Sequence, residues 1–122
     1  MVQETSIRRI SVIGPGMMGH AIAQEFAAAG YEVTLCGRSE KRLAEACTKI
    51  ENSLHELARW KLISEDNVEP ALSRLATTTD LEAAGSSADF IVESIVEVLE
   101  VKEKLFSKLD AVCPQHTIFV EA

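Results

Sequence analysis

The chain has few of the features that mark secreted, membrane-spanning or nucleic-acid-binding proteins. Its three cysteines are odd in number and form no Cys-x-x-Cys pair, which argues against a disulfide framework and a structural zinc site. Lys and Arg number 12 against 19 Asp and Glu, and this net charge of -7 argues against a nucleic-acid or membrane partner. No apolar run approaches the roughly 18 residues of a membrane-spanning helix, and no signal-peptide pattern opens the sequence. We therefore expect a cytoplasmic protein with reduced thiols and no metal.

The composition that is present is typical of a single globular domain. The 122 residues are 47% hydrophobic and 25% charged, as in ordinary soluble proteins. A chain of this length buries roughly two thirds of its unfolded surface and folds without disulfides or metals. We treat residues 1–122 as one domain.

A strand-like apolar run at residues 7–13 leads directly into a Gly-x-Gly-x-x-Gly segment, and a small-residue helical pattern follows at 21–29. In that context Gly14 permits a tight turn, Gly16 lets backbone approach a pyrophosphate, and Gly19 lets the helix lie close to the strand. The phosphates would face the unpaired N–H groups of a helix N-terminus. The segment predicts a dinucleotide site, with a glycine turn that binds nothing as the alternative. The expected cofactor loop contains Gly14, Gly16, Met17, Met18 and Gly19.

Strand-like and helical patterns alternate along the rest of the chain. Further strands are expected at 31–36, 75–78, 88–94 and 117–120. A long helix with Ser39 as N-cap and a second helix opening at Ser64 separate strands two and three. This order predicts an α/β fold with a Rossmann-type doubly wound parallel sheet of order 3-2-1-4-5 and a helical pair inserted between strands two and three.

Finer expectations concern the helices. Gly30 suits the left-handed position after the first helix, Pro70 is expected to interrupt or restart a helix, and Gly85 to end the turn at 81–84. Two apolar stripes are expected to be buried, one on the first helix and one on the long helix. They consist of Met18, Ile22 and Phe26, and of Leu43, Cys47, Ile50, Leu54 and Leu57.

Several stretches of the chain carry a family resemblance when they are taken together. They are residues 10–24, 78–81, 91–97 (Ile-Val-Glu-Ser-Ile-Val-Glu), 101–106 and 116–119. They resemble the N-terminal NAD(P)-binding domain of the 3-hydroxyacyl-CoA dehydrogenase family, over nearly the whole chain. The 91–97 segment is the most selective, because related β-hydroxyacid dehydrogenases share the glycine loop without it. The resemblance implies hydride transfer between a nicotinamide and C3 of a 3-hydroxyacyl or 3-oxoacyl thioester.

The resemblance also implies roles for three charged residues. Glu93 would lie at the carboxyl end of its strand on the nicotinamide side, with a solvated strand-end carboxylate as the alternative. Glu97 is either a second polar wall of that pocket or a first-turn acid of the next helix. Lys61, beside Trp60, matches a region that contacts CoA in relatives, with a lysine that faces water as the alternative.

The residue that usually binds the adenosine ribose is replaced. The family carries Asp at the end of the second strand, about 20 residues past the loop, whereas this chain has Gly37 followed by Arg38 and Ser39. A carboxylate repels a 2′-phosphate, and an arginine pairs with it and stacks on adenine. We therefore expect NADP(H) to be slightly favoured over NAD(H). The alternative is a solvated Arg38 and weak NAD binding.

The residues that handle the substrate proton in the family lie beyond the matching stretch. Relatives continue into an Asn/Ser-rich loop and then a His and a Glu, and residues 120–122 already depart from that loop. We expect His20, His55 and His116 not to replace the missing base, and we assign no catalytic residue. The chain is expected to be a monomer that binds dinucleotide with little turnover. Acyl-CoA would bind only if a C-terminal domain is supplied.

Two other functions remain open from the sequence. One is a non-catalytic dinucleotide-binding or sensor module that acts through a partner chain. The other is a related small β-hydroxyacid dehydrogenase domain, which the loop at 17–19 and the turn at 37–39 favour and the 91–97 segment opposes. Cys36, beside the cofactor pocket, is expected to serve as a small buried apolar residue, with a modifiable thiol as the alternative.

Overall fold

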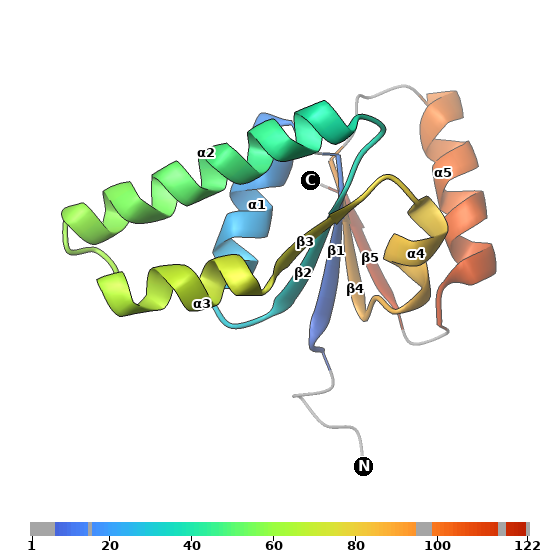
Figure 1. The fold of residues 1–122 in the computed structure, drawn as a ribbon. Helices are drawn as coiled ribbons and strands as arrows, with labels where there is room; N and C mark the ends of the chain where they lie inside the picture. The colour runs from blue at the N-terminus through green and yellow to red at the C-terminus, as the bar shows by residue number, and fades with distance from the viewer. Residues whose placement is uncertain (1–6, 15, 95–98, 115–116, 122) are drawn as a thin grey trace, which may run out of the picture.

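A computed structural model describes residues 7–14, 16–94, 99–114 and 117–121. Within these ranges five parallel strands form one sheet in the order β3-β2-β1-β4-β5 (Figure 1). This order confirms the predicted doubly wound topology. The strands are β1 (Arg9–Ile13), β2 (Glu32–Cys36), β3 (Leu75–Thr78), β4 (Phe90–Glu93) and β5 (Ile118–Glu121).

Helices cover both faces of this sheet (Figure 1). One face carries α1 (Met17–Ala28), α2 (Glu40–Arg59) and α3 (Val68–Ser73), and a 3₁₀ turn, η2 (Glu65–Asn67), links the last two. The opposite face carries α4 (Leu81–Ser86) and α5 (Leu99–Val112). All neighbouring strands pair in parallel, so the carboxyl ends of all five strands meet at one edge of the sheet. No described helix is both long and apolar enough to span a membrane.

The side chains of β1 alternate between the two faces and enter two separate cores. Ile10 and Val12 pack in the core beneath α1, α2 and α3, whereas Ile13 packs with the residues that lie under α4 and α5. Between them, the buried Ser11 hydroxyl donates to the Ala84 carbonyl oxygen at 2.6 Å. This bond fastens the short helix α4 to the central strand.

The buried face of α1 differs from the predicted stripe. Met18 is 60% exposed, and Ile22 and Phe26 are only partly buried. The residues that face the sheet are instead Gly19, Ala23 and Ala27. The reason is distance, because α1 lies so close to the sheet that small residues fill its contact and larger side chains are displaced to its flanks. The prediction for Met18 was wrong.

The long helix α2 follows its predicted stripe in part. Leu43, Ile50 and Leu54 are buried as expected, but Ala46 and Ala58 complete the buried face, and Cys47 and Leu57 are half-buried. Ser39 is the N-cap, because its hydroxyl accepts from the Arg42 backbone N–H at 3.2 Å. The predicted cap is thus confirmed.

Three positions predicted to end or restart helices have different outcomes. Gly30 has a φ of 104° directly after α1, which confirms its predicted conformation. Pro70 lies in the first turn of α3 after the 3₁₀ turn, which confirms a restart at a position where proline is tolerated. Gly85 lies inside α4 and does not end it. A Cβ there would lie only 3.0 Å from Leu109 Cδ2, so the glycine allows α4 to pack on α5.

Candidate dinucleotide site

The turn after β1 begins with a backbone conformation suited to glycine. Gly14 has a φ of 108°, a region that strains any residue with a Cβ. Its N–H donates to the Cys36 carbonyl oxygen at 2.7 Å, so the turn is fastened to the end of β2. The loop therefore starts at a fixed point on the carboxyl edge of the sheet.

Helix α1 approaches this turn as closely as backbone allows. A Cβ on Gly19 would overlap the Gly14 carbonyl oxygen and lie 2.9 Å from the Gly14 carbonyl carbon. Only glycine fits at this position, as the motif predicts for close packing of helix and strand. The contact fixes the direction in which the first N–H groups of α1 point.

Gly16, at the start of α1, faces open space. A Cβ built on it meets nothing within 4 Å. No side chain caps the helix, and its first turn contains no acidic residue. The first N–H groups of α1 thus have no side-chain partner and carry the positive end of the helix dipole. This uncapped glycine cradle fits a diphosphate. The exposed Met18 lies beside it, whereas the side chain of Met17 lies outside the described part of the structure.

Glu93 lies at the point where the strand order reverses. It pairs in register with Ile13, the last residue before the glycine turn, and the Ser94 N–H donates to the Ile13 carbonyl oxygen at 2.8 Å. Ligands of doubly wound sheets bind at this switch point. The Glu93 side chain has an exposed fraction of 0%, so the alternative of a solvated strand-end carboxylate is wrong. Glu97 lies outside the described residues.

The turn after β2 presents the residues expected at the adenosine ribose. The Gly37 N–H donates to the Thr78 carbonyl oxygen at 3.2 Å, so the turn is anchored to β3. The next side chain, Arg38, is exposed. Ser39 caps α2, whose N-terminus therefore opens beside this arginine. An exposed cation at this turn suits an anionic group, whereas the N-terminus of α2 already has Ser39 as its cap and Glu40 in its first turn.

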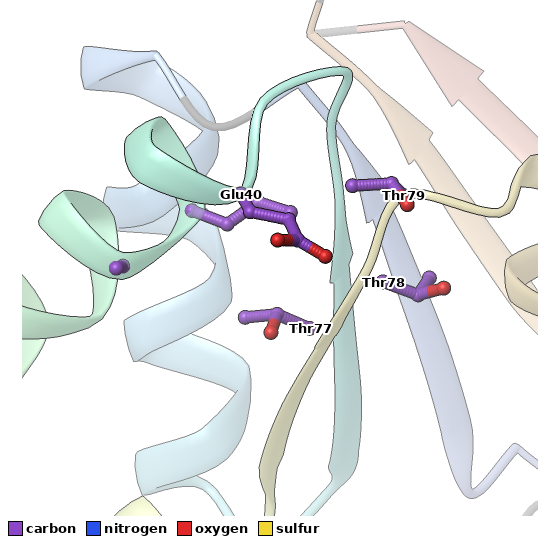
Figure 2. Close-up of a pocket in the computed structure, with 6 residues that line it drawn as sticks. Glu40, Thr77, Thr78 and Thr79 are labelled. Carbon is purple, nitrogen blue, oxygen red and sulfur yellow. The ribbon is translucent and has the colours of Figure 1, made fainter.

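A half-open pocket of about 210 Å³ lies on the α2 side of the β3 end. Figure 2 shows the Glu40 carboxylate extending from the first turn of α2 toward Thr77, Thr78 and Thr79. This carboxylate was not among the site residues predicted from the sequence, although its place directly after the cap Ser39 was a signal, since acids favour helix first turns. Glu40 adds a negative charge one residue beyond the expected ribose turn.

The thiol beside the glycine turn is buried and neutral at ordinary pH. Burial, followed by the nearby Asp80 carboxylate, raises the pKa of Cys36 from 9.0 to about 11. Cys36 thus serves as a small apolar residue, as predicted. The described residues contain no cluster of His, Cys, Asp and Glu that could hold a metal ion.

Lys61 does not join the other predicted site residues. It follows α2 at the tip of the helical pair, which extends away from the carboxyl edge of the sheet (Figure 1). It is exposed and has a φ of 61°. Next to it, the 67% exposed Trp60 donates from Nε1 to Glu56 Oε1 at 2.9 Å, and Arg59 Nη2 donates to the same oxygen at 3.0 Å.

Comparison with known proteins identifies the family of this chain. A family model described as "3-hydroxyacyl-CoA dehydrogenase, NAD binding domain" matches residues 9–121. The chain belongs to this family. Its cofactor class is therefore a nicotinamide dinucleotide, and the resemblance inferred from the motifs is confirmed.

Members of the 3-hydroxyacyl-CoA dehydrogenase family resemble this chain in sequence. It is 42% identical over 118 residues to the human mitochondrial hydroxyacyl-coenzyme A dehydrogenase, covering 93% of this chain and 38% of the relative. It is 38% identical over 114 residues to the 3-hydroxyadipyl-CoA dehydrogenase of Escherichia coli K12, covering 93% of this chain and 24% of the relative. The chain thus spans less than two fifths of the length of these relatives.

Solved structures of 3-hydroxyacyl-CoA dehydrogenases also resemble this chain. The 3-hydroxybutyryl-CoA dehydrogenase of Escherichia coli K12 matches with a TM-score of 0.91 and 34% identity, over 95% of this chain and 24% of that chain. The 3-hydroxyisobutyrate dehydrogenase of Mycobacterium tuberculosis matches with a TM-score of 0.59 and 16% identity, over 94% of this chain and 31% of that chain. The second match shows a shared fold alone.

Proposed function

We propose that this chain is the dinucleotide-binding part of an NAD(P)-dependent 3-hydroxyacyl-CoA dehydrogenase. The observation that carries the proposal is the uncapped glycine cradle beside the buried Glu93 at the switch point of the sheet. When bound, the dinucleotide supplies a nicotinamide that exchanges hydride with C3 of a 3-hydroxyacyl thioester.

Each end of the site has its own part in this function. The first N–H groups of α1 bind the diphosphate, because Gly14, Gly16 and Gly19 let the dinucleotide approach the backbone. Glu93 is a fully buried carboxylate on the nicotinamide side of the switch point, where the packing around it excludes water. These residues thus bind and orient the cofactor. Removal of the proton from the substrate hydroxyl requires a separate general base.

The described histidines do not provide that group. His20 lies on α1 beside the diphosphate cradle. His55 lies on α2, where its Nδ1 is 3.4 Å from Oε1 of Glu65 in the 3₁₀ turn η2. His116 lies outside the described residues. We therefore propose that the 122-residue chain binds dinucleotide but turns over slowly or not at all without a base held at the substrate hydroxyl.

A binding titration and an activity assay on the same preparation test this proposal. NADH or NADPH should bind, as followed by nicotinamide fluorescence, while acetoacetyl-CoA should not be reduced at a steady rate. Gly16→Ala serves as the binding control because it alters the cradle without crowding the fold. Robust turnover by the chain alone would contradict the catalytic part of the proposal, and failure to bind either nucleotide would contradict the whole.

We propose further that NADP(H) is slightly favoured over NAD(H). Gly37 removes the ribose carboxylate of the family, and the exposed Arg38 lies beside the N-terminus of α2 capped by Ser39. A 2′-phosphate there would meet the bidentate guanidinium of Arg38. Glu40 opposes the preference, because its carboxylate lies one residue further along. Arg38 is therefore expected to shift the balance only modestly.

The cofactor preference is tested by the ratio of NADPH to NADH affinity. Arg38→Ala should lower NADPH affinity by about tenfold and leave NADH affinity nearly unchanged. Glu40→Gln is the matched variant and should raise NADPH affinity. Tighter NADH binding that Arg38→Ala does not alter would refute the preference.

We also propose that Lys61 contacts the CoA part of the substrate once a C-terminal domain is supplied. Two observations support this contact: the Lys61 side chain is exposed at the tip of the helical pair, and a second cation, Arg59, lies near it in the sequence. In a longer protein that contains this chain and a C-terminal domain, Lys61→Ala should raise the KM for acyl-CoA with little change in kcat. An unchanged KM would count against this contact.

A further inference from the structure

His20 is a titratable side chain at the diphosphate end of the site that the proposed function does not use. It directly follows Gly19, and it is half-buried in the first turns of α1. Its Nδ1 lies 2.9 Å from the carbonyl oxygen of Gly16, and its own backbone N–H donates to the same oxygen at 2.9 Å. The imidazole is therefore held against the first turn of the helix, beside the glycine cradle.

This contact determines which ring nitrogen carries the proton. A carbonyl oxygen only accepts hydrogen bonds, so the Nδ1 of His20 must donate to Gly16. In the neutral imidazole Nε2 is then an acceptor, and it becomes a donor only when the ring is protonated. Diphosphate oxygens are also acceptors. A neutral His20 therefore has no hydrogen bond to give to a diphosphate bound at the cradle.

The other charged groups near this end of α1 belong to different elements. Helix α1 packs against β1, β2, α2 and α3, and its first turn contains no acidic residue. From the C-cap of α3, Arg74 reaches the opposite end of α1, where its Nε donates to the Ala27 carbonyl oxygen at 3.0 Å. Charged residues at the carboxyl edge of the sheet include Arg38, Glu40, Lys41 and Arg42 at the start of α2, Asp80 after β3, Glu93 at the end of β4 and Glu121 at the end of β5.

We propose that His20 couples dinucleotide binding to the uptake of a proton. In the bound state the imidazolium donates from Nε2 to a diphosphate oxygen while Nδ1 continues to donate to Gly16. The proton comes from solvent, and no covalent bond of the nucleotide changes. By linkage, binding then becomes tighter as the pH falls through the range in which histidine changes charge. This inference rests on the proposed dinucleotide binding.

Proton uptake is measured by calorimetric titration of the 122-residue chain with NADH in two buffers of different ionisation enthalpy. NADH is the probe because it lacks the 2′-phosphate, which itself titrates near this range. Wild-type protein should take up a fraction of a proton near neutral pH and bind about fivefold tighter at pH 6.0 than at pH 8.0. His20→Asn keeps an amide N–H near the position of Nδ1 but cannot take up the proton.

The variants separate this inference from the proposed function. His20→Asn should bind NADH with an affinity that no longer changes with pH and matches the wild type at the higher pH. His55→Asn, at the distant pair with Glu65, should behave as wild type. If NADH binds but wild type and His20→Asn show the same proton uptake, the role of His20 is overturned and dinucleotide binding stands. If NADH does not bind at any pH, the proposed function fails first.

Discussion

A Cβ on Gly19 would occupy the space of the Gly14 carbonyl oxygen. Both groups are held by backbone, Gly14 through its bond to Cys36 and Gly19 within α1, so neither can move without shifting an element. Gly19→Ala should therefore lower the free energy of unfolding by about 3 kcal/mol, because overpacking forces backbone shifts. Urea unfolding measures this. An unfolding midpoint equal to that of wild type would mean that α1 can move away from the turn.

Gly16→Ala should have the opposite profile. The added methyl meets nothing within 4 Å, and φ at this residue is -64°, which alanine adopts readily. Stability should stay within about 0.5 kcal/mol of wild type. Dinucleotide affinity should fall at least about tenfold, because the methyl occupies the approach to the helix N–H groups. NADH titration checks this, and unchanged affinity would place the diphosphate elsewhere.

Removal of the Ser11 hydroxyl should weaken the link between β1 and α4. Ser11→Ala leaves the Ala84 carbonyl oxygen without this buried donor, and such a loss costs about 1–2 kcal/mol. Ser73→Ala is the matched control, because the Ser73 hydroxyl also bonds a backbone carbonyl, that of Pro70, but on the surface. Urea unfolding should show a clear loss for the first variant and a change below about 0.5 kcal/mol for the second. Equal losses would contradict the buried role.

Cys36 should resist alkylation in the folded protein. Its pKa is raised from 9.0 to about 11, first by burial and then by Asp80, so little thiolate exists near pH 8. Burial also raises the pKa of Cys47 and Cys113, but both are only half-buried and should react first. Peptide mass spectrometry after iodoacetamide treatment distinguishes the three thiols, and treatment in urea should make them react alike. Early labelling of Cys36 would show that the carboxyl end of β2 opens.

The same thiol should make stability depend on alkaline pH. The unfolded chain releases the Cys36 proton near pH 9, whereas the folded chain holds it to about pH 11. The free energy of unfolding should therefore be highest below pH 9 and fall as the pH rises through 11. Cys36→Ala should show a shallower fall than wild type when both are unfolded in urea across this range. Parallel curves would mean that the thiol is not protected by folding.

The topology was accessible to sequence reasoning because each element carried a local signal. Gly14, Gly30 and Ser39 act through their own backbone or the next turn, and the structure places them as predicted. The buried face of α1 was not accessible, because the identity of its contact residues depends on how near the helix lies to the sheet. That distance is set by the backbone contact between Gly19 and Gly14, where a Cβ on Gly19 would overlap the Gly14 carbonyl oxygen. The hydrophobic periodicity of the sequence does not show this contact.

The sequence likewise located the candidate site but did not show the contacts that depend on tertiary packing. Motif spacing located the cradle and the end of β4, but the complete burial of Glu93 results from packing of strands and helices around it. Glu40 was missed because its importance depends on a pocket shared with β3, a strand more than 30 residues away. The tautomer of His20 likewise required the distance from Nδ1 to the Gly16 oxygen. The cofactor preference stays a prediction.

The hydrogen bonds that Trp60 and Arg59 both donate to Glu56, at the end of α2, affect the fluorescence of the protein. Trp60 is the single tryptophan of the chain, and its indole is largely in water while Glu56 and Arg59 hold its orientation. Its intrinsic fluorescence should be red-shifted and should report on the fraying of α2, not on events at the glycine cradle. Glu56→Ala should loosen the indole and lower the fluorescence anisotropy, while nicotinamide emission remains the direct signal for the cofactor.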